Sequence, residues 1–223
     1  MYKILEKTQF SEKVFKFRIE APQMAKHAHA GQFLMVRANE TGERVPFTFA
    51  DWNPEEGWVE FIFMVVGKTT KMLSTYEAGD SLEDVTGPLG QPSEFGDGKW
   101  GVIGGGVGLA IAFPIARKLV KEGKDVHAIM GARTKDLLLL EDQFRSILPD
   151  DHIHITTDDG SYGEKGVVTA PEERLLEAGQ IDHIFCVGPV PMMKFATLTA
   201  VKHDCPITAS LNPIMVDGTG MCG

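Results

Sequence analysis

Short apolar stretches separated by turn residues make up the first part of the chain, up to about residue 95. Apolar and polar residues alternate in "KVFKFRIEA" (13–21), while β-branched or aromatic residues dominate "GQFLMVRA" (31–38) and "WVEFIFMVV" (58–66). Turn-forming segments such as "NETGE" and "NPEEG" separate these stretches. Alternation with a period of two is typical of strands with one buried face. The pattern predicts an antiparallel barrel or sandwich.

The pattern of apolar and polar residues changes after "FGDGK" (95–99), whose glycines interrupt the alternation. An apolar strand, a glycine turn, an amphipathic helix that ends near Gly123 and a second strand follow in "WGVIGGGVGLAIAFPIARKLVKEGKDVHAIMGART". Further strands are expected in "HIHITTDD" and "HIFCVGP", and further helices in "APEERLLEAG" and "VPMMKFATLTAVKH". Strands that alternate with helices predict a parallel sheet of the Rossmann type. We therefore expect a β domain at 1–96, an α/β domain at 97–210 and a separate tail at 211–223.

Composition and charge remove several classes of function. The 223 residues carry a formal net charge of −9, which argues against nucleic-acid binding and against anionic membranes. The N-terminus "MYKILEKTQF" lacks a signal-peptide core, and no apolar run approaches the roughly 18 residues of a membrane span. Three irregularly spaced cysteines suit a reducing compartment. We expect a cytoplasmic protein without membrane insertion.

The strongest chemical signal is "VIGGGVGLA", residues 102–110. Four glycines, Gly104, Gly105, Gly106 and Gly108, lie between a predicted buried strand and a helix. Glycines let the backbone approach a pyrophosphate, and a helix N-terminus offers unpaired N–H groups to it. The segment departs from a strict G-x-G-x-x-G, because Leu109 stands in the place of the last glycine. The pattern predicts a dinucleotide site, with a tight turn that binds nothing as the alternative.

Arg133 stands where many dinucleotide-binding folds carry an acidic residue, after the second strand of this domain. An arginine there would hold a 2′-phosphate and favour NADP. A solvent-exposed loop arginine, or one that contacts a pyrophosphate, explains the sequence equally well.

Two segments of the β part combine groups that bind anions. "RVPFTFAD" joins a cation, a rigid turn, an aromatic ring and a hydroxyl, and "MVVGKTTKML" places a glycine, a lysine and two threonines at an expected helix start. Each segment alone is also consistent with ordinary turn chemistry.

The order of these motifs, completed by "VTGPLG", resembles the ferredoxin–NADP⁺ reductase superfamily over essentially the whole chain. The resemblance implies a flavin-binding Greek-key β-barrel followed by a nicotinamide-binding α/β domain. It implies FAD contacts at Arg44, Pro46, Phe47, Thr48, Val66, Gly67, Thr69, Thr70 and Gly87. It implies nicotinamide-nucleotide contacts at Gly104, Gly105, Gly106, Gly108, Arg133, Asp159, Gly188, Pro189 and Met192. The family's usual cysteine position is Val187 here; Cys186 is expected to face the other way, and no catalytic side chain is assigned.

The tail "MVDGTGMCG" (215–223) is similar to the start of the [2Fe–2S] motif in electron-transfer subunits of this superfamily. The resemblance implies that Asp217 and Cys222 ligate a cluster, with aspartate in place of the first cysteine. Harder ligation would shift its potential. Two further cysteines are needed, so we expect a truncated or clipped chain with an absent or incomplete cluster. The alternative is that Cys222 is an isolated thiol.

The implied function is an FAD-dependent oxidoreductase subunit that moves a hydride between NAD(H) or NADP(H) and FAD. Single electrons would then pass through the cluster to a larger flavin/iron–sulfur partner, as in electron-bifurcating ferredoxin:NADP⁺ oxidoreductases. The partner would reach ferredoxin. Electron-transfer subunits of dihydroorotate dehydrogenase or of a hydrogenase are alternatives within this class. A non-catalytic nucleotide-binding regulatory module is the alternative of another class.

The histidines show no spacing that predicts a metal site. His27 and His29 share one face of their segment, and His152 and His154 share one face of a strand. We interpret both pairs as exposed β positions.

Overall fold

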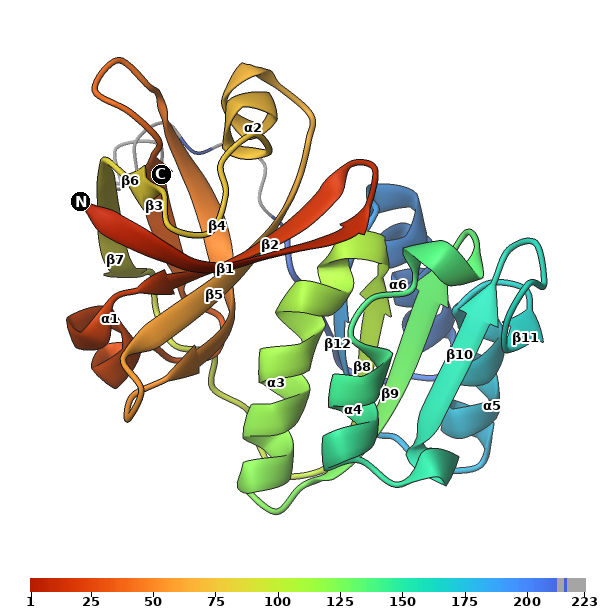
Figure 1. Cartoon of the computed structure of the whole chain (residues 1–223). Coiled ribbons are helices and arrows are strands. Elements are labelled where there is room, and N and C mark those ends of the chain that lie inside the picture. The colour runs from red at the N-terminus through yellow and green to blue at the C-terminus, as the bar shows by residue number, and fades with distance from the viewer. Residues whose placement is uncertain (212–214, 216–223) are drawn as a thin grey trace. The chain divides into compact units, whose positions relative to one another are not determined.

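The computed structural model describes residues 1–211 and 215 and divides this part of the chain into two compact units, Met1–Ser93 and Glu94–Leu211. Each unit has its own sheet (Figure 1). Among the described helices, none combines the length and apolar character needed to cross a membrane.

The first unit is a seven-stranded sheet in which every neighbouring pair is antiparallel. The strand order is β6 (Ser81–Leu82), β1 (Tyr2–Ser11), β2 (Val14–Glu20), β5 (Trp58–Met64), β4 (Arg44–Asn53), β3 (Phe33–Arg37) and β7 (Asp84–Leu89). Two short helices accompany the sheet, α1 (Pro22–His27) and α2 (Lys68–Leu73). The sheet is nearly closed on itself, which confirms the predicted antiparallel barrel.

The period-two pattern places the large side chains of this unit inside the sheet. Phe17 on β2 lies opposite Phe61 on β5, and the two rings meet edge-to-face at 5.8 Å. Phe17 also contacts Phe63 at 5.1 Å. All three side chains are buried. Full burial of such a ring stabilises the fold by about 2–3 kcal/mol, so these residues anchor the unit.

The second unit is a six-stranded sheet in which every neighbouring pair is parallel. The order is β11 (Glu164–Lys165), β10 (Ile153–Thr157), β9 (Asp125–Ala132), β8 (Lys99–Gly105), β12 (His183–Val187) and β13 (Ile207–Ala209). The helices α3 (Leu109–Lys121) and α4 (Glu141–Ile147) cover one face, and α5 (Thr169–Glu177) and α6 (Val190–Lys202) cover the other (Figure 1). Single turns η1 (Gly106–Gly108), η2 (Lys135–Leu137) and η3 (Asp150–His152) complete the unit. The predicted parallel, Rossmann-like sheet is confirmed.

The central strands of this sheet are apolar on both sides because helices cover both faces. Residues 100–105 of β8 and 126–131 of β9 are buried without interruption. In the sheet, β9 is the neighbour of β8 on one side, and β12 is its neighbour on the other side. The order of the strands therefore reverses between β8 and β12, and such a point is where open α/β sheets bind ligands.

Candidate nucleotide and flavin sites

The glycine-rich segment lies at the reversal point of the second sheet. β8 runs through Gly104 and Gly105 into the turn η1, and α3 begins directly afterwards. No side chain caps the first turn of α3. The Leu109 N–H is bonded to the Gly106 carbonyl, so α3 continues directly from η1, and the positive end of this helical segment attracts an anion.

The structure brings this segment together with the other predicted nicotinamide segment, 188–192. A Cβ atom on Gly108 would lie 2.5 Å from the carbonyl oxygen of Val187 and 2.9 Å from Cα of Gly188. A Cβ atom on Gly105 would lie 2.4 Å from Sδ of Met192 and 3.1 Å from Cδ of Pro189. Gly188 itself has φ +156. Two segments about 80 positions apart therefore form one edge whose close approach requires glycine.

Arg133 and Asp159 lie in the loops that follow the two neighbouring strands, β9 and β10. The two loops touch, because Asp159 N–H donates to the carbonyl oxygen of Arg133 at 3.3 Å. The Asp159 carboxylate accepts a hydrogen bond from Ser161 N–H at 2.9 Å, and the bonds from Ser161 lower its pKa. The nicotinamide candidates of this unit thus gather at the carboxyl ends of four adjacent strands.

In the first unit, four of the predicted flavin residues lie on β4. Arg44 forms an ion pair with Asp84 at 2.6 Å and donates to the Thr86 hydroxyl at 3.2 Å. Phe47 stacks on Phe61 with 5.0 Å between the ring centroids, so the core already occupies one of its faces. Pro46 and Thr48 lie opposite Met35 and Phe33 on β3.

The turn that leads into α2 is organised by Thr70. Its hydroxyl oxygen accepts hydrogen bonds from the N–H groups of Val66 and Gly67, both at 3.0 Å, and its side chain is buried. Val66 is itself 75% exposed. Thr70 therefore fixes the backbone of the turn. At Gly67, an added Cβ atom would meet no other atom within 4 Å.

Thr70→Val is expected to destabilise the first unit by about 1–2 kcal/mol, because two backbone N–H donors of the turn lose their acceptor. Chemical denaturation measures the change. Thr75→Val is the matched control, since the Thr75 hydroxyl donates only to the Met72 carbonyl at 2.7 Å on the exposed side of the same segment. Equal losses in the two variants would contradict this role of Thr70.

Gly87 follows Thr86 on β7, to which Arg44 donates, and an added Cβ atom at Gly87 would lie 3.2 Å from Cβ of Leu34. With Pro88, Gly87 lines a cavity of about 580 Å³ bounded by the start of β1 and by α1. No other predicted flavin residue lines that cavity. The predicted cluster ligands Asp217 and Cys222 lie outside the described residues.

Cys186 belongs to the hydrophobic cluster that Met193 and Ala196 of α6 also form. It is fully buried, and burial raises the pKa of its thiol to about 12. The thiol is therefore neutral and packs as an apolar group, as its expected orientation implied.

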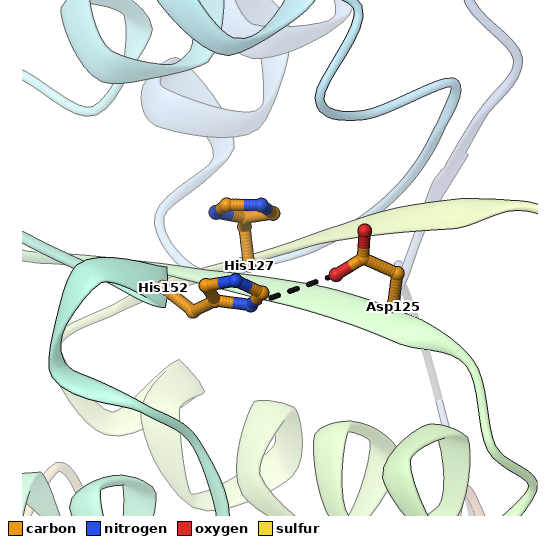
Figure 2. Close-up of side chains that lie close together, drawn as sticks. All are labelled: Asp125, His127 and His152. Carbon is orange, nitrogen blue, oxygen red and sulfur yellow. Dashed lines mark ion pairs between the residues drawn. The ribbon is translucent and has the colours of Figure 1, made fainter.

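The interpretation of His152 and His154 as exposed β positions was wrong, because both are half-buried, His152 lies in η3, and the two form a cluster with His127. His127 of β9 is 4% exposed, its ring stacks on His152 at 4.1 Å, and its Nδ1 lies 3.1 Å from Nε2 of His154. Figure 2 shows the two stacked rings beside Asp125, whose carboxylate lies 3.5 Å from His152 Nδ1. Burial, together with the nearby His152 and His154, lowers the pKa of His127 to about 4. One ligand atom each of Asp125, His127 and His152 lies within 4.8 Å of the others, while Nδ1 of His127 is already engaged with His154.

The two units match two sequence families in the order that the motifs predicted. Residues 1–93 match the family described as "Oxidoreductase FAD-binding domain", and residues 102–197 match "Oxidoreductase NAD-binding domain". The chain is a flavin- and nicotinamide-binding oxidoreductase of the ferredoxin reductase-like fold.

Proteins of known name extend this match over the whole chain. The "Dihydroorotate dehydrogenase B (NAD(+)), electron transfer subunit homolog" of Thermotoga maritima is 48% identical over 221 residues, 99% of this chain and 77% of that protein. The "Dihydroorotate dehydrogenase B (NAD(+)), electron transfer subunit" of Shouchella clausii is 30% identical and covers 98% of this chain and 84% of its own length.

A solved structure also matches throughout. It is described as that of an NADH-dependent reduced ferredoxin–NADP oxidoreductase, and it superposes with a TM-score of 0.90 at 47% identity, covering 100% of this chain and 80% of its own. These similarities, together with the two domains and their glycine-lined edge, show that the chain belongs to the family of FAD- and NAD-binding electron-transfer subunits that includes that of dihydroorotate dehydrogenase B.

Proposed function

We propose that this chain is the NADH-oxidising subunit of a larger complex, and that it passes single electrons from a flavin to a partner subunit. The observation that carries the proposal is the glycine-lined edge at the strand-order reversal of the second unit, joined in one chain to an FAD-binding domain. FAD, when bound, accepts a hydride as two electrons and releases the electrons singly.

The residues of the second unit would bind and orient the nicotinamide nucleotide. The N–H groups of the turn η1, where this helical segment begins, would hold its pyrophosphate, and Gly105, Gly108 and Gly188 would allow the backbone to approach. Positioning is the main contribution that hydride transfer requires of the protein. No side chain at this edge is assigned as an acid or base.

A [2Fe–2S] cluster would extend the path, with Asp217 and Cys222 as its first protein ligands. The support is the register of "MVDGTGMCG" with the family motif. The relatives support a partner subunit, because several are named as electron-transfer subunits.

The final acceptor distinguishes two forms of the proposal. Similarity at 47% identity to a protein described as a bifurcating NADH-dependent ferredoxin–NADP oxidoreductase favours electron bifurcation that includes ferredoxin. The names of the relatives support the second form, an electron-transfer subunit of dihydroorotate dehydrogenase. Because the partner determines the acceptor, purification of the complex and identification of its large subunit decide between the two.

Anaerobic titration with NADH and then with NADPH tests the proposal. We expect flavin absorbance in the visible band to bleach with one equivalent of the preferred nucleotide. Arg133 contributes to that preference if it contacts a 2′-phosphate, in which case Arg133→Ala would weaken NADPH and leave NADH unchanged. Tight nucleotide binding without any bleaching would instead indicate a regulatory module.

A further inference from the structure

Three charged residues lie in one row across neighbouring strands of the first unit. Arg37 on β3 is directly opposite Arg44 on β4 and directly opposite Asp84 on β7. Directly opposed residues of antiparallel strands project from the same face of the sheet, so all three side chains share one face.

The ion pair in this row does not join nearest neighbours. Arg44 reaches Asp84 at 2.6 Å although β3, which carries Arg37, lies between their strands. Nε of Arg37 is buried and has no hydrogen-bond partner. Within the part of the chain that the structure describes, Arg37 forms no ion pair either. The row therefore carries two guanidinium groups and one carboxylate, and that carboxylate pairs with Arg44 alone.

Such an arrangement needs an explanation, because like charges opposite one another in a sheet are destabilising and buried donors are normally paired. An anion bound on this row would satisfy both requirements. Two adjacent guanidinium groups match the oxygens of a phosphate or pyrophosphate in geometry and charge.

The row lies close to the second anion-binding candidate of the same unit. β3 ends at Arg37, and the chain continues through Ala38 and Asn39. The carbonyl oxygen of Ala38 accepts a hydrogen bond from the Tyr76 hydroxyl at 3.1 Å, and the Asn39 amide lies 3.1 Å from Met72 Sδ of α2. The end of β3 and the helix after the Gly67 turn are thus tied together.

We propose that Arg37 and Arg44 jointly bind the pyrophosphate of the flavin dinucleotide, and that Asp84 competes with it for Arg44. This inference rests on the proposed flavin function. Arg37 supplies the charge that no protein group neutralises, and Asp84 holds Arg44 in place until a phosphate replaces it. Asp84 thereby sets the affinity for the dinucleotide.

Equilibrium titration of the flavin-free protein with FAD, ADP and riboflavin tests the proposal. Arg37→Gln is expected to weaken FAD and ADP about tenfold and leave riboflavin unchanged, since only the first two carry a pyrophosphate. Arg37→Lys should restore part of the loss. Asp84→Asn is expected to tighten FAD several-fold. Arg18→Gln is the control, because Arg18 of the same unit is already neutralised by Glu60 at 2.7 Å.

The outcomes separate the two levels of the argument. Absence of FAD binding in the unmodified protein would sink the proposed function itself. Normal FAD binding with an unchanged FAD-to-riboflavin affinity ratio in Arg37→Gln would overturn only the role of Arg37. Weaker FAD binding in Asp84→Asn would overturn the competition and show that Asp84 positions Arg44.

Discussion

Substituting Gly108 with alanine is expected to slow reduction of the flavin by NADH severely. The added Cβ atom would lie 2.5 Å from a backbone oxygen, that of Val187, and 2.9 Å from Cα of Gly188. Neither atom belongs to a side chain that could turn away, so β12 and the start of α3 must separate. That displacement opens the edge on which we place the nicotinamide pyrophosphate. We expect the rate at subsaturating NADH to fall at least about a hundredfold, which corresponds to roughly 3 kcal/mol.

Stopped-flow reduction under anaerobic conditions measures this rate. Gly96→Ala is the control, because an added Cβ atom there meets nothing within 4 Å. Binding of FAD should survive in both variants, since the substitution lies in the other unit. Reduction of Gly108→Ala at the unmodified rate would show that the nucleotide does not use this edge.

Replacing Glu172 with methionine is expected to stabilise the protein, and more strongly in alkaline solution than in acid. Glu172 of α5 is fully buried, and neither of its carboxylate oxygens has a hydrogen-bond partner. Burial, assisted by the charge of Glu173, raises its pKa from 4.5 to about 8. The folded protein therefore retains a proton that the unfolded chain releases.

The sign of the pH dependence follows from this difference. The stabilising contribution of the retained proton is complete below pH 4.5 and is lost as the pH rises from there through about 8. The loss amounts to about 5 kcal/mol when the shift is converted at 1.36 kcal/mol per pKa unit. Methionine fills a similar volume and carries no titrating group.

Urea denaturation at pH 5 and pH 9 measures the effect. The free energy of unfolding should fall between these values in the unmodified protein and much less in Glu172→Met. Glu177→Gln, on the exposed side of the same helix, should retain the original pH dependence. An identical decline in Glu172→Met would show that the buried carboxyl is not its source.

Sequence patterns predicted the two architectures because each has a strong period. Alternation in "KVFKFRIEA" indicated a sheet with one buried face, and "VIGGGVGLA" indicated the turn from strand to helix at the reversal point. The short helices α1 and α4 were not predicted, because six and seven residues are too few to establish a helical period.

The missed site residues depend on strand register. Arg37 reads as an ordinary polar residue at the end of a strand, and only the pairing with Arg44 and Asp84 makes it unusual. His127 reads as a single histidine in an apolar strand, whereas the alignment of β9 with β10 places it beside His154. Local sequence carries no information about which distant strand lies alongside.

The glycines of the nucleotide loop differ in what makes each one necessary. Gly105 is crowded chiefly by the flexible end of Met192, so a smaller residue at 192 would make room for a side chain at position 105. Gly108 faces main-chain atoms, which every amino acid possesses, and no exchange elsewhere relieves it. A search pattern for distant homologues should accordingly tolerate variation at the second glycine of the loop and insist on the fourth.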